Sequence, residues 1–242
     1  MRLRVVGCSP AWPNPGSAHS GYLVEEDGRR LLLDCGPGVL ARLRETEPWP
    51  RIDAIAITHL HLDHWADLVP WAWGIRVGPG GDVDAPELWL PPGAADELAA
   101  SEQVGGDAVV ETFPVREYGT APFAAAGFEV TAVPLVHYDV SSFGLRVTGG
   151  GGTLAYGTDT APTPALAELG RDADLFLCEA TLAGPEKGAL RGHMTAEEAV
   201  AAFRASRARR LLVVHRPIEL PLPDHVERAR DGLVVELERT RP

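Results

Sequence analysis

Lysine is almost absent from this sequence, since only one of its 22 basic residues is a lysine, Lys187, and the other 21 are arginines. Cysteine is also scarce, with three residues far apart at Cys8, Cys35 and Cys178. An odd and scattered set argues against a disulfide framework, so we expect buried free thiols in a reducing cytoplasm. No apolar run approaches the roughly 18 residues that a membrane helix needs, which excludes a spanning segment.

Acidic residues outnumber basic residues in this sequence. The chain has 22 basic and 34 acidic residues, a net charge of -12. This balance creates a long-range field that is unfavourable for polyanions such as RNA. Two bound divalent cations would change the net charge only to -8 (-12 + 4). Binding of nucleic acid would therefore depend on a local basic patch.

The overall composition is that of an ordinary globular protein: 242 residues, 45% of them hydrophobic and 23% charged. It excludes a collagen-like, coiled-coil or largely disordered chain. We find no internal repeat and no long linker, and we expect a single domain over residues 1–242. Met1 leads directly into a strand-like segment without an apolar signal sequence, so we expect a cytoplasmic protein.

Apolar runs bounded by turn residues predict the secondary structure. Strands are expected at 2–7, 20–25, 29–34, 52–58, 86–90, 108–113, 128–136, 143–148, 153–158, 174–178, 210–214 and 232–237. Helices are expected at 37–46, 64–76, 93–103, 163–170, 195–206 and 223–230. Early hairpins followed by alternating helices and strands favour a layered α/β protein. The run Gly149-Gly150-Gly151-Gly152 predicts a hairpin turn, because no helix start follows that would bind a phosphate.

The strongest functional signal is Thr58-His59-Leu60-His61-Leu62-Asp63-His64, which directly follows an apolar strand pattern. In extended backbone His59 and His61 point to the same side, because side chains repeat every two residues. The two imidazoles can therefore share one metal, while Asp63 and His64 can face a second ion. Imidazole and carboxylate at this density suit Zn, Mn or Fe.

Four further residues each follow or end an apolar run. They are Asp34, His137, Asp159 and His215. Taken singly, His137 and His215 could be hydrogen-bonded core histidines, and Asp34 could shape a turn. Because each stands at the C-terminal end of a strand pattern, a common sheet edge could gather all of them beside the histidine cluster.

These residues together resemble the metal motifs of the metallo-β-lactamase superfamily, in chain order and over nearly the whole chain. Three shorter matches resemble its ribonuclease Z-like branch. They are the opening Val6-Gly7-Cys8-Ser9-Pro10, the pattern of His137 followed by Ser142-Phe143-Gly144-Leu145-Arg146, and the pair Glu179-Ala180-Thr181 and Gly192-His193-Met194-Thr195. The resemblance implies an αβ/βα four-layer sandwich, with two mixed sheets face to face, helices outside and metals at one rim.

The resemblance also implies the ligand set for two divalent metal ions, with Zn expected first and Mn or Fe as alternatives. His59, His61 and His137 would hold the first ion, Asp63, His64 and His215 the second, and Asp159 would bridge them. A water activated by both cations is the nucleophile that such sites provide. Asp34 is expected to orient a ligand, and Asp63 is counted among the catalytic residues as well as the ligands.

His193 has no metal left to bind in this assignment. It stands before Thr195-Ala196-Glu197-Glu198, a capping-box pattern that opens the next helix. We expect His193 to act as general acid toward the leaving oxygen, positioned by Glu179. A loop histidine with a structural hydrogen bond is the alternative. His19 and His225 are left without a role.

Two further groups stay open. Trp65, Trp71 and Trp73 follow the cluster on one expected helix, kinked at Pro70, and could line the pocket or pack in the core. Arg204, Arg207, Arg209 and Arg210 near a helix end could be a solvated face that favours the helix dipole or an RNA patch.

The leading hypothesis for function is a dinuclear metal-dependent phosphodiesterase acting on a small phosphodiester or a nucleic-acid 3′ end. Ribonuclease Z enzymes that grip tRNA carry a long arm, often between the equivalents of His137 and Asp159, but that interval here is only 22 residues (159 − 137). The alternative is a thioester, lactone or β-lactam hydrolase of the same superfamily. A di-iron redox enzyme is disfavoured, because such relatives resemble H-x-E-x-D-H and position 61 is His. The resemblance alone suggests a homodimer, and no membrane partner is expected.

Overall fold

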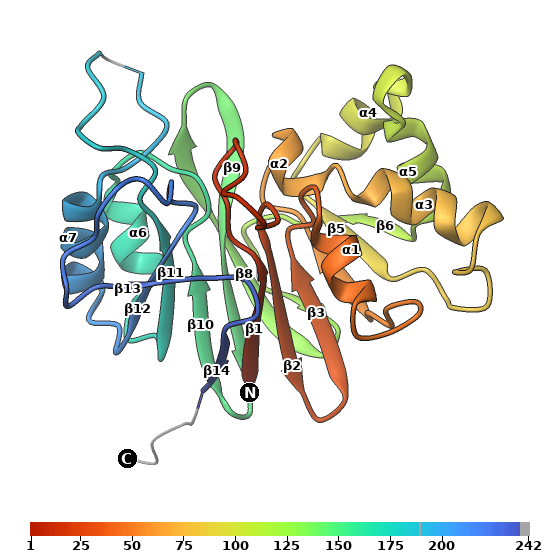
Figure 1. Cartoon of the computed structure of the whole chain (residues 1–242), viewed down its shortest axis with the longest axis horizontal. Coiled ribbons are helices and arrows are strands. Elements are labelled where there is room, and N and C mark those ends of the chain that lie inside the picture. The colour runs from red at the N-terminus through yellow and green to blue at the C-terminus, as the bar shows by residue number, and fades with distance from the viewer. Residues whose placement is uncertain (189, 238–242) are drawn as a thin grey trace.

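Two sheets lie face to face, and helices cover the outer face of each (Figure 1). The computed structural model describes residues 1–188 and 190–237. The first sheet has the strand order β14-β1-β2-β3-β4-β5-β6. Its strands are β1 (Arg2–Gly7), β2 (Gly21–Glu26), β3 (Arg29–Leu33), β4 (Ala54–Ala56), β5 (Glu87–Leu90), β6 (Val115–Glu117) and β14 (Val234–Glu236).

The second sheet has the order β13-β12-β11-β10-β9-β8-β7. Its strands are β7 (Phe123–Ala125), β8 (Phe128–His137), β9 (Val140–Gly149), β10 (Gly152–Tyr156), β11 (Leu175–Glu179), β12 (Leu211–Val214) and β13 (Glu227–Arg228). This is the four-layer αβ/βα sandwich that the sequence predicts.

The helices divide between the two sheets. Those on the first sheet are α1 (Val39–Arg44), α2 (Leu62–Trp65), α3 (Leu68–Val77), α4 (Ala94–Ala99), the 3-10 turn Glu102–Val104 and α5 (Gly106–Thr112), and those on the second are α6 (Pro164–Leu169) and α7 (Ala196–Ser206). None of the helices in the described part of the chain combines the length and the apolar character that a membrane crossing requires.

Burial explains the strand sequences. Strand β11 is apolar at successive positions because both of its faces are covered: Leu175 and Leu177 lie in the core between the sheets, whereas Phe176 and Cys178 pack under α6 and α7. All three cysteines are free and buried, as expected.

The strand directions place the candidate residues at one rim. In the second sheet β8, β10, β11 and β12 run the same way, since β9 is antiparallel to both β8 and β10 and the later pairs are parallel. In the first sheet β3, β4, β5 and β6 are parallel. The carboxyl ends of these strands therefore meet at the edge that carries α2, the upper edge in Figure 1.

Three sequence predictions were wrong. The run 108–113 is not a strand, because it lies mostly in α5, where Ala108 and Val109 pack inward. The run 223–230 is not a helix, because Glu227 and Arg228 pair beside β12 as a short edge strand. The expected helix 64–76 is two helices, and the break falls at Asp67, before Pro70.

The Gly149–Gly152 hairpin turn is confirmed, since these two residues face each other at the ends of β9 and β10. The carboxylate of Glu26 accepts from the N–H groups of Gly150 and Gly151. This turn binds a neighbouring strand of the protein.

Candidate metal centre

The structure brings all seven predicted ligands to one place at the rim. They come from both sheets: His59 and His61 follow β4, Asp63 and His64 begin α2, His137 ends β8, Asp159 follows β10 and His215 follows β12. All except the half-buried His61 are buried. The strand ends therefore bring the candidate ligands together at one edge of the sheets, as the sequence predicts.

A first group joins His59, His61, His137 and Asp159, whose candidate ligand atoms all lie within 4.8 Å of one another. Nε2 of His137 lies 2.9 Å from Nδ1 of His61. The ring centroids of His59 and His61 are 4.9 Å apart, so the two side chains converge as their spacing predicts.

A second group joins Asp63, His64, Asp159 and His215. The Oδ2 atom of Asp63 lies 3.4 Å from Nε2 of His64 and 3.1 Å from Nε2 of His215. The Oδ2 atom of Asp159 lies 3.4 Å from the same two nitrogens. It also lies 4.0 Å from Nε2 of His137, so Asp159 faces both groups.

The donor sets fit divalent cations. Nε2 of His59, Nε2 of His64 and Oδ1 of Asp159 are buried and have no hydrogen-bond partner. Buried polar atoms without a partner are rare and often mark a missing ion. Ligands at about 2.0–2.1 Å around a tetrahedral cation are roughly 3.3 Å apart, close to the separations observed here.

Asp34 orients two elements of the centre. It is fully buried, directly follows β3 and has a left-handed backbone with φ of 59°. Its carboxylate accepts from the Nδ1 atom of His64 at 2.7 Å, from the hydroxyl of Tyr156 at 2.7 Å, and from the N–H and hydroxyl of Thr58 at 2.8 and 3.0 Å. Asp34 thus binds a candidate ligand rather than facing the metal groups itself, as expected from the sequence.

Three more ring nitrogens are fixed in the same way. Nδ1 of His59 contacts the hydroxyl of Thr58 at 3.1 Å, Nδ1 of His137 donates to the carbonyl of Gly192 at 2.7 Å, and Nδ1 of His215 contacts the hydroxyl of Thr181 at 2.9 Å. Each contact leaves Nε2 free to face the centre.

The protonation states of five candidate ligands suit metal binding, whereas the charges of Asp159 and Asp34 raise the pKa of His64 against its burial, so a cation would have to displace a proton from that ring. Burial lowers the pKa values of His59, His61 and His137, so these rings are neutral. Burial alone would raise the pKa values of Asp63 and Asp159, but His215 and His64 hold both far below the ordinary range. Neutral imidazole and ionised carboxylate are the forms that bind a metal.

His193 lies beside both groups. Its ring centroid is 4.9 Å from that of His137 and 5.8 Å from that of His215. Its Nδ1 atom lies 2.8 Å from Oε1 of the fully buried Glu179. Burial alone would lower the pKa of His193, but the hydrogen bond and charge of Glu179 raise it to about 9.

Comparison with known proteins assigns the family. A family model described as "Beta-lactamase superfamily domain" matches residues 29–216, which include all seven candidate ligands. The chain belongs to the metallo-β-lactamase superfamily.

Relatives within this superfamily identify the branch. The chain is 30% identical over 227 residues to the probable metallo-hydrolase YhfI of Bacillus subtilis, covering 90% of this chain and 87% of YhfI. The crystal structure of YhfI matches with a TM-score of 0.83 at 25% identity, covering 97% and 98% of the two chains. Ribonuclease Z of Bradyrhizobium diazoefficiens is 26% identical over 269 residues, covering 88% of each. The short form of human tRNase Z matches with a TM-score of 0.76 at 25% identity, covering 98% and 99%. The chain is therefore a metallo-hydrolase of the ribonuclease Z-like branch.

The hydroxyl groups around the centre were not predicted from the sequence. Thr58, Tyr156 and Thr181 each bind a candidate ligand or Asp34. A usable signal exists for two of them, because Thr58 directly precedes His59 and Thr181 lies two residues after Glu179. Tyr156 is one of several buried tyrosines, and its partner depends on how the two sheets face each other.

The tryptophans do not share a helix, because Trp65 is on α2 and Trp71 and Trp73 are on α3. Trp65 and Trp71 are buried between the first sheet and its helices, whereas Trp73 is about half exposed (49%). Core packing is therefore the role of the first two. His19 places both ring nitrogens near carbonyl oxygens, of Pro37 and Ala11, and so connects two loops.

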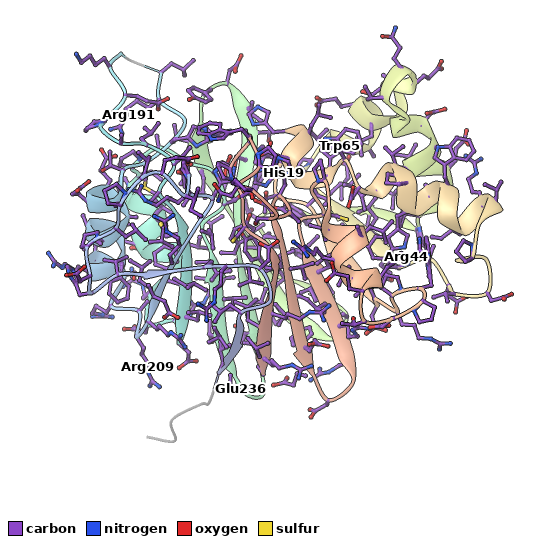
Figure 2. All side chains as sticks on the ribbon, in the orientation of Figure 1. His19, Arg44, Trp65, Arg191, Arg209 and Glu236 are labelled. Atoms are coloured by element: carbon purple, nitrogen blue, oxygen red, sulfur yellow. The ribbon has the colours of Figure 1, made fainter. Side chains whose placement is uncertain are left out.

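The arginine run lies away from the metal groups. Figure 2 shows Arg209 at the lower edge and His19 near the upper rim. Arg204 is in the last turn of α7, Arg207 pairs with Asp172 at 2.9 Å, and Arg210 pairs with Glu227 at 2.7 Å. These contacts favour the interpretation as a helix end and its ion pairs over an RNA patch.

Proposed function

We propose that this metallo-hydrolase cleaves a phosphodiester bond and that His193 is its general acid. The observation that carries the proposal is the place of the His193 ring, which lies beside candidate ligands of both groups and is held by Glu179. The relatives named ribonuclease Z and tRNase Z support the bond type, because RNA cleavage breaks phosphodiesters.

Two divalent cations, with Zn expected first, would be held by His59, His61, His137 and Asp159 and by Asp63, His64, Asp159 and His215. When bound, they would activate a water as nucleophile and stabilise the charge on the phosphoryl oxygens. The chain's own part is to place these donors. Asp63 and Asp159 supply negative charge, and Asp34, Thr58 and Thr181 fix the rings.

Glu179 sets the protonation of His193. Its Oε1 atom accepts from Nδ1 of His193 and from the N–H of Thr160 at 3.1 Å, while its Oε2 atom accepts from the N–H and hydroxyl of Thr181 at 2.9 and 2.7 Å. A proton on Nδ1 therefore stays with Glu179, and Nε2 is the atom that can give its proton to a leaving oxygen. Cations nearby would lower the pKa of His193 from about 9 toward neutrality, because like charges repel.

A small substrate suits the rest of the molecule. The interval from His137 to Asp159 is filled by β9, the Gly149–Gly152 turn and β10, so a tRNA-gripping arm has no place there. The net charge of -12 and the distance of the arginine run from the centre also disfavour a long polyanion. We therefore propose a cyclic nucleotide or another small phosphodiester as substrate.

The test compares two leaving groups in one variant. His193→Ala should keep its zinc but lose roughly 10²–10⁴-fold in turnover of a substrate with a ribose leaving group. The loss should be small for bis-p-nitrophenyl phosphate, because p-nitrophenolate departs without a proton. His225→Ala, at an exposed histidine, is the matched control.

Each other result contradicts a part of the proposal. Equal losses on both substrates would make His193 a structural residue, and loss of zinc would make it a ligand, with Glu179 and His215 as its partners. Turnover of a thioester with no phosphodiester cleaved would overturn the phosphodiesterase itself.

A further inference from the structure

The segment that carries His193 is fixed by a second carboxylate, Glu186, which the catalytic assignment does not use. Oε2 of Glu186 accepts from the N–H of Gly192 at 2.8 Å and from the N–H of His193 at 3.2 Å. Its Oε1 atom accepts from the hydroxyl of Tyr138. Burial alone would raise the pKa of Glu186, but these three donors lower it, so the carboxylate is charged at neutral pH.

Tyr138, which donates its hydroxyl to Glu186, comes from a different segment of the second sheet. It directly follows His137 in the β8–β9 turn, with a left-handed φ of 50° that a tyrosine rarely adopts. Its N–H donates to the carbonyl of Arg191 at 3.0 Å. Its ring packs on the backbone of Gly192, where a Cβ atom would lie 2.1 Å from Cε2 of Tyr138. Only glycine at position 192 permits this approach.

The Gly192 peptide links this arrangement to the centre. Its carbonyl accepts from Nδ1 of His137, a candidate ligand, and its N–H donates to Glu186. The next residue is His193, whose ring centroid is 5.7 Å from that of Tyr138. The peptide between Gly192 and His193 is thus held at its carbonyl by His137 and at its N–H by Glu186.

We infer that Glu186, together with Tyr138, is a positioning residue that sets the place of the His193 ring relative to the leaving oxygen. This inference rests on the proposed function of His193. Glu179 fixes the ring by its Nδ1 atom, but a single hydrogen bond leaves the ring free to move along the rim with its backbone. Glu186 removes that freedom, because it accepts hydrogen bonds from the N–H groups of Gly192 and His193. These bonds fix the backbone that carries the ring.

A structural role and a positioning role predict different kinetics. A loop that is merely loosened would slow all substrates alike or release metal. A displaced general acid slows only the substrates whose leaving group needs a proton, since a misplacement of about 1 Å can cost roughly 10²-fold in rate.

The experiment uses the full-length zinc-loaded protein with three variants, Glu186→Ala, Glu186→Gln and Tyr138→Phe. Lys187→Ala is the control, an exposed neighbour in the same loop. The substrates are bis-p-nitrophenyl phosphate and two phosphodiesters with ribose leaving groups, 3′,5′-cyclic AMP and the dinucleotide UpU.

We expect Glu186→Ala to lower kcat on the ribose substrates by roughly 10-fold or more and on bis-p-nitrophenyl phosphate by less than about 2-fold, with KM unchanged. Glu186→Gln should recover most of the loss, because its amide oxygen accepts the same two N–H groups. Tyr138→Phe should show a smaller loss with the same dependence on leaving group.

A readout without activity accompanies the kinetics. In ¹⁵N spectra the amide signals of Gly192 and His193 should shift and lose protection from exchange in Glu186→Ala, while zinc content stays at the wild-type value. Unchanged amides, or equal losses on all substrates, would overturn the inference. If the wild-type protein cleaves none of the phosphodiesters, the proposed function fails, and the amide signals still decide whether Glu186 holds the segment.

Discussion

Three carboxylates organise the residues around the metal groups without being members of the ligand set. Asp34 accepts hydrogen bonds from His64 and Thr58. Glu179 accepts one from the ring of His193, and Glu186 accepts one from the N–H of His193. Each accepts at least three hydrogen bonds, so each is a fixed negative charge near the site where cations would bind. The rings of His64 and His193 are therefore held by charge-assisted bonds rather than by packing alone.

The pKa of His193 gives the metal-free protein a pH dependence. A group whose pKa rises from 6.5 to about 9 on folding contributes stability that is complete below pH 6.5 and lost as the pH rises through 9. We expect the free energy of unfolding of the metal-free protein to fall by at most about 3 kcal/mol across this window. Urea titrations at pH 6.5, 7.5 and 9 measure it.

His193→Gln should reduce this fall and leave the part due to His64, whose pKa Asp159 and Asp34 raise against its burial, whereas His225→Gln at an exposed position should keep the whole fall. A wild-type stability that is flat from pH 6.5 to 9 would mean that Glu179 does not hold a protonated His193.

Among the elements, α7 connects the catalytic loop to the second sheet through its first turn. The hydroxyl of Thr195 accepts from the N–H of Glu198 at 3.3 Å, and the Glu198 carboxylate accepts from the N–H of Thr195 at 2.9 Å. This is the capping box that the sequence predicts. The same Glu198 carboxylate binds Arg191, so the cap also fixes the residues just before His193.

Removing the cap should weaken the helix but not the metal groups. Thr195→Ala should lower the free energy of unfolding by about 1 kcal/mol, because the N–H of Glu198 loses its acceptor, the Thr195 hydroxyl. Urea denaturation measures the change, with Thr120→Ala in an exposed turn as control. Thr195→Ser keeps the hydroxyl and should recover the stability. If it does not, the methyl group rather than the cap explains the loss.

The errors in the sequence-based elements have physical reasons. Residues 108–113 are rich in β-branched residues, but Val109 is buried among helices α3, α4 and α5, so packing outweighs the strand propensity. In 223–230 the helical spacing of Val226 and Ala229 misleads, since the N–H of Ala229 bonds the carbonyl of Val213 at the sheet edge. Neither outcome is visible without the neighbouring elements.

The gathering of the seven candidate ligands at one rim was predictable because it depends on local order, with His, His, Asp and His in six positions and the others at strand ends. Tyr138 and Glu186 were not, since their contact joins residues 48 positions apart and nothing in the spacing marks it. The candidate metal ligands carry a sequence pattern, whereas the contacts that hold their surroundings in place depend on the fold.

For the molecule as a whole, the candidate centre joins the two sheets. His59, His61, Asp63 and His64 come from the first sheet's side, and His137, Asp159 and His215 from the second. Cations held there would bridge both halves of the sandwich. The homodimer expected from family resemblance stays a prediction.

Removal of metal should therefore destabilise the whole protein. A cation that binds only the folded state stabilises it by about 4 kcal/mol at a thousandfold excess over Kd, so chelation should lower Tm by roughly 10 °C or more. Calorimetry before and after dialysis against EDTA measures the shift, and added zinc should restore it. A Tm that does not move once elemental analysis shows the metal gone would contradict the bridging of the sheets.

The division of the ligands between the sheets also orders events during synthesis on the ribosome. The cluster from His59 to His64 emerges first, and His215 follows His59 by 156 residues (215 − 59). At about 5–20 residues per second, roughly 8–30 s separate the two. Until Asp159 emerges, 100 residues after His59 (159 − 59), the nascent chain exposes three imidazoles and a carboxylate without the partners that complete either group, and the second group stays incomplete until His215. Metal acquisition is therefore coupled to the docking of the second sheet. The early cluster can bind a cation before the complete donor set, which selects between metal ions, has formed.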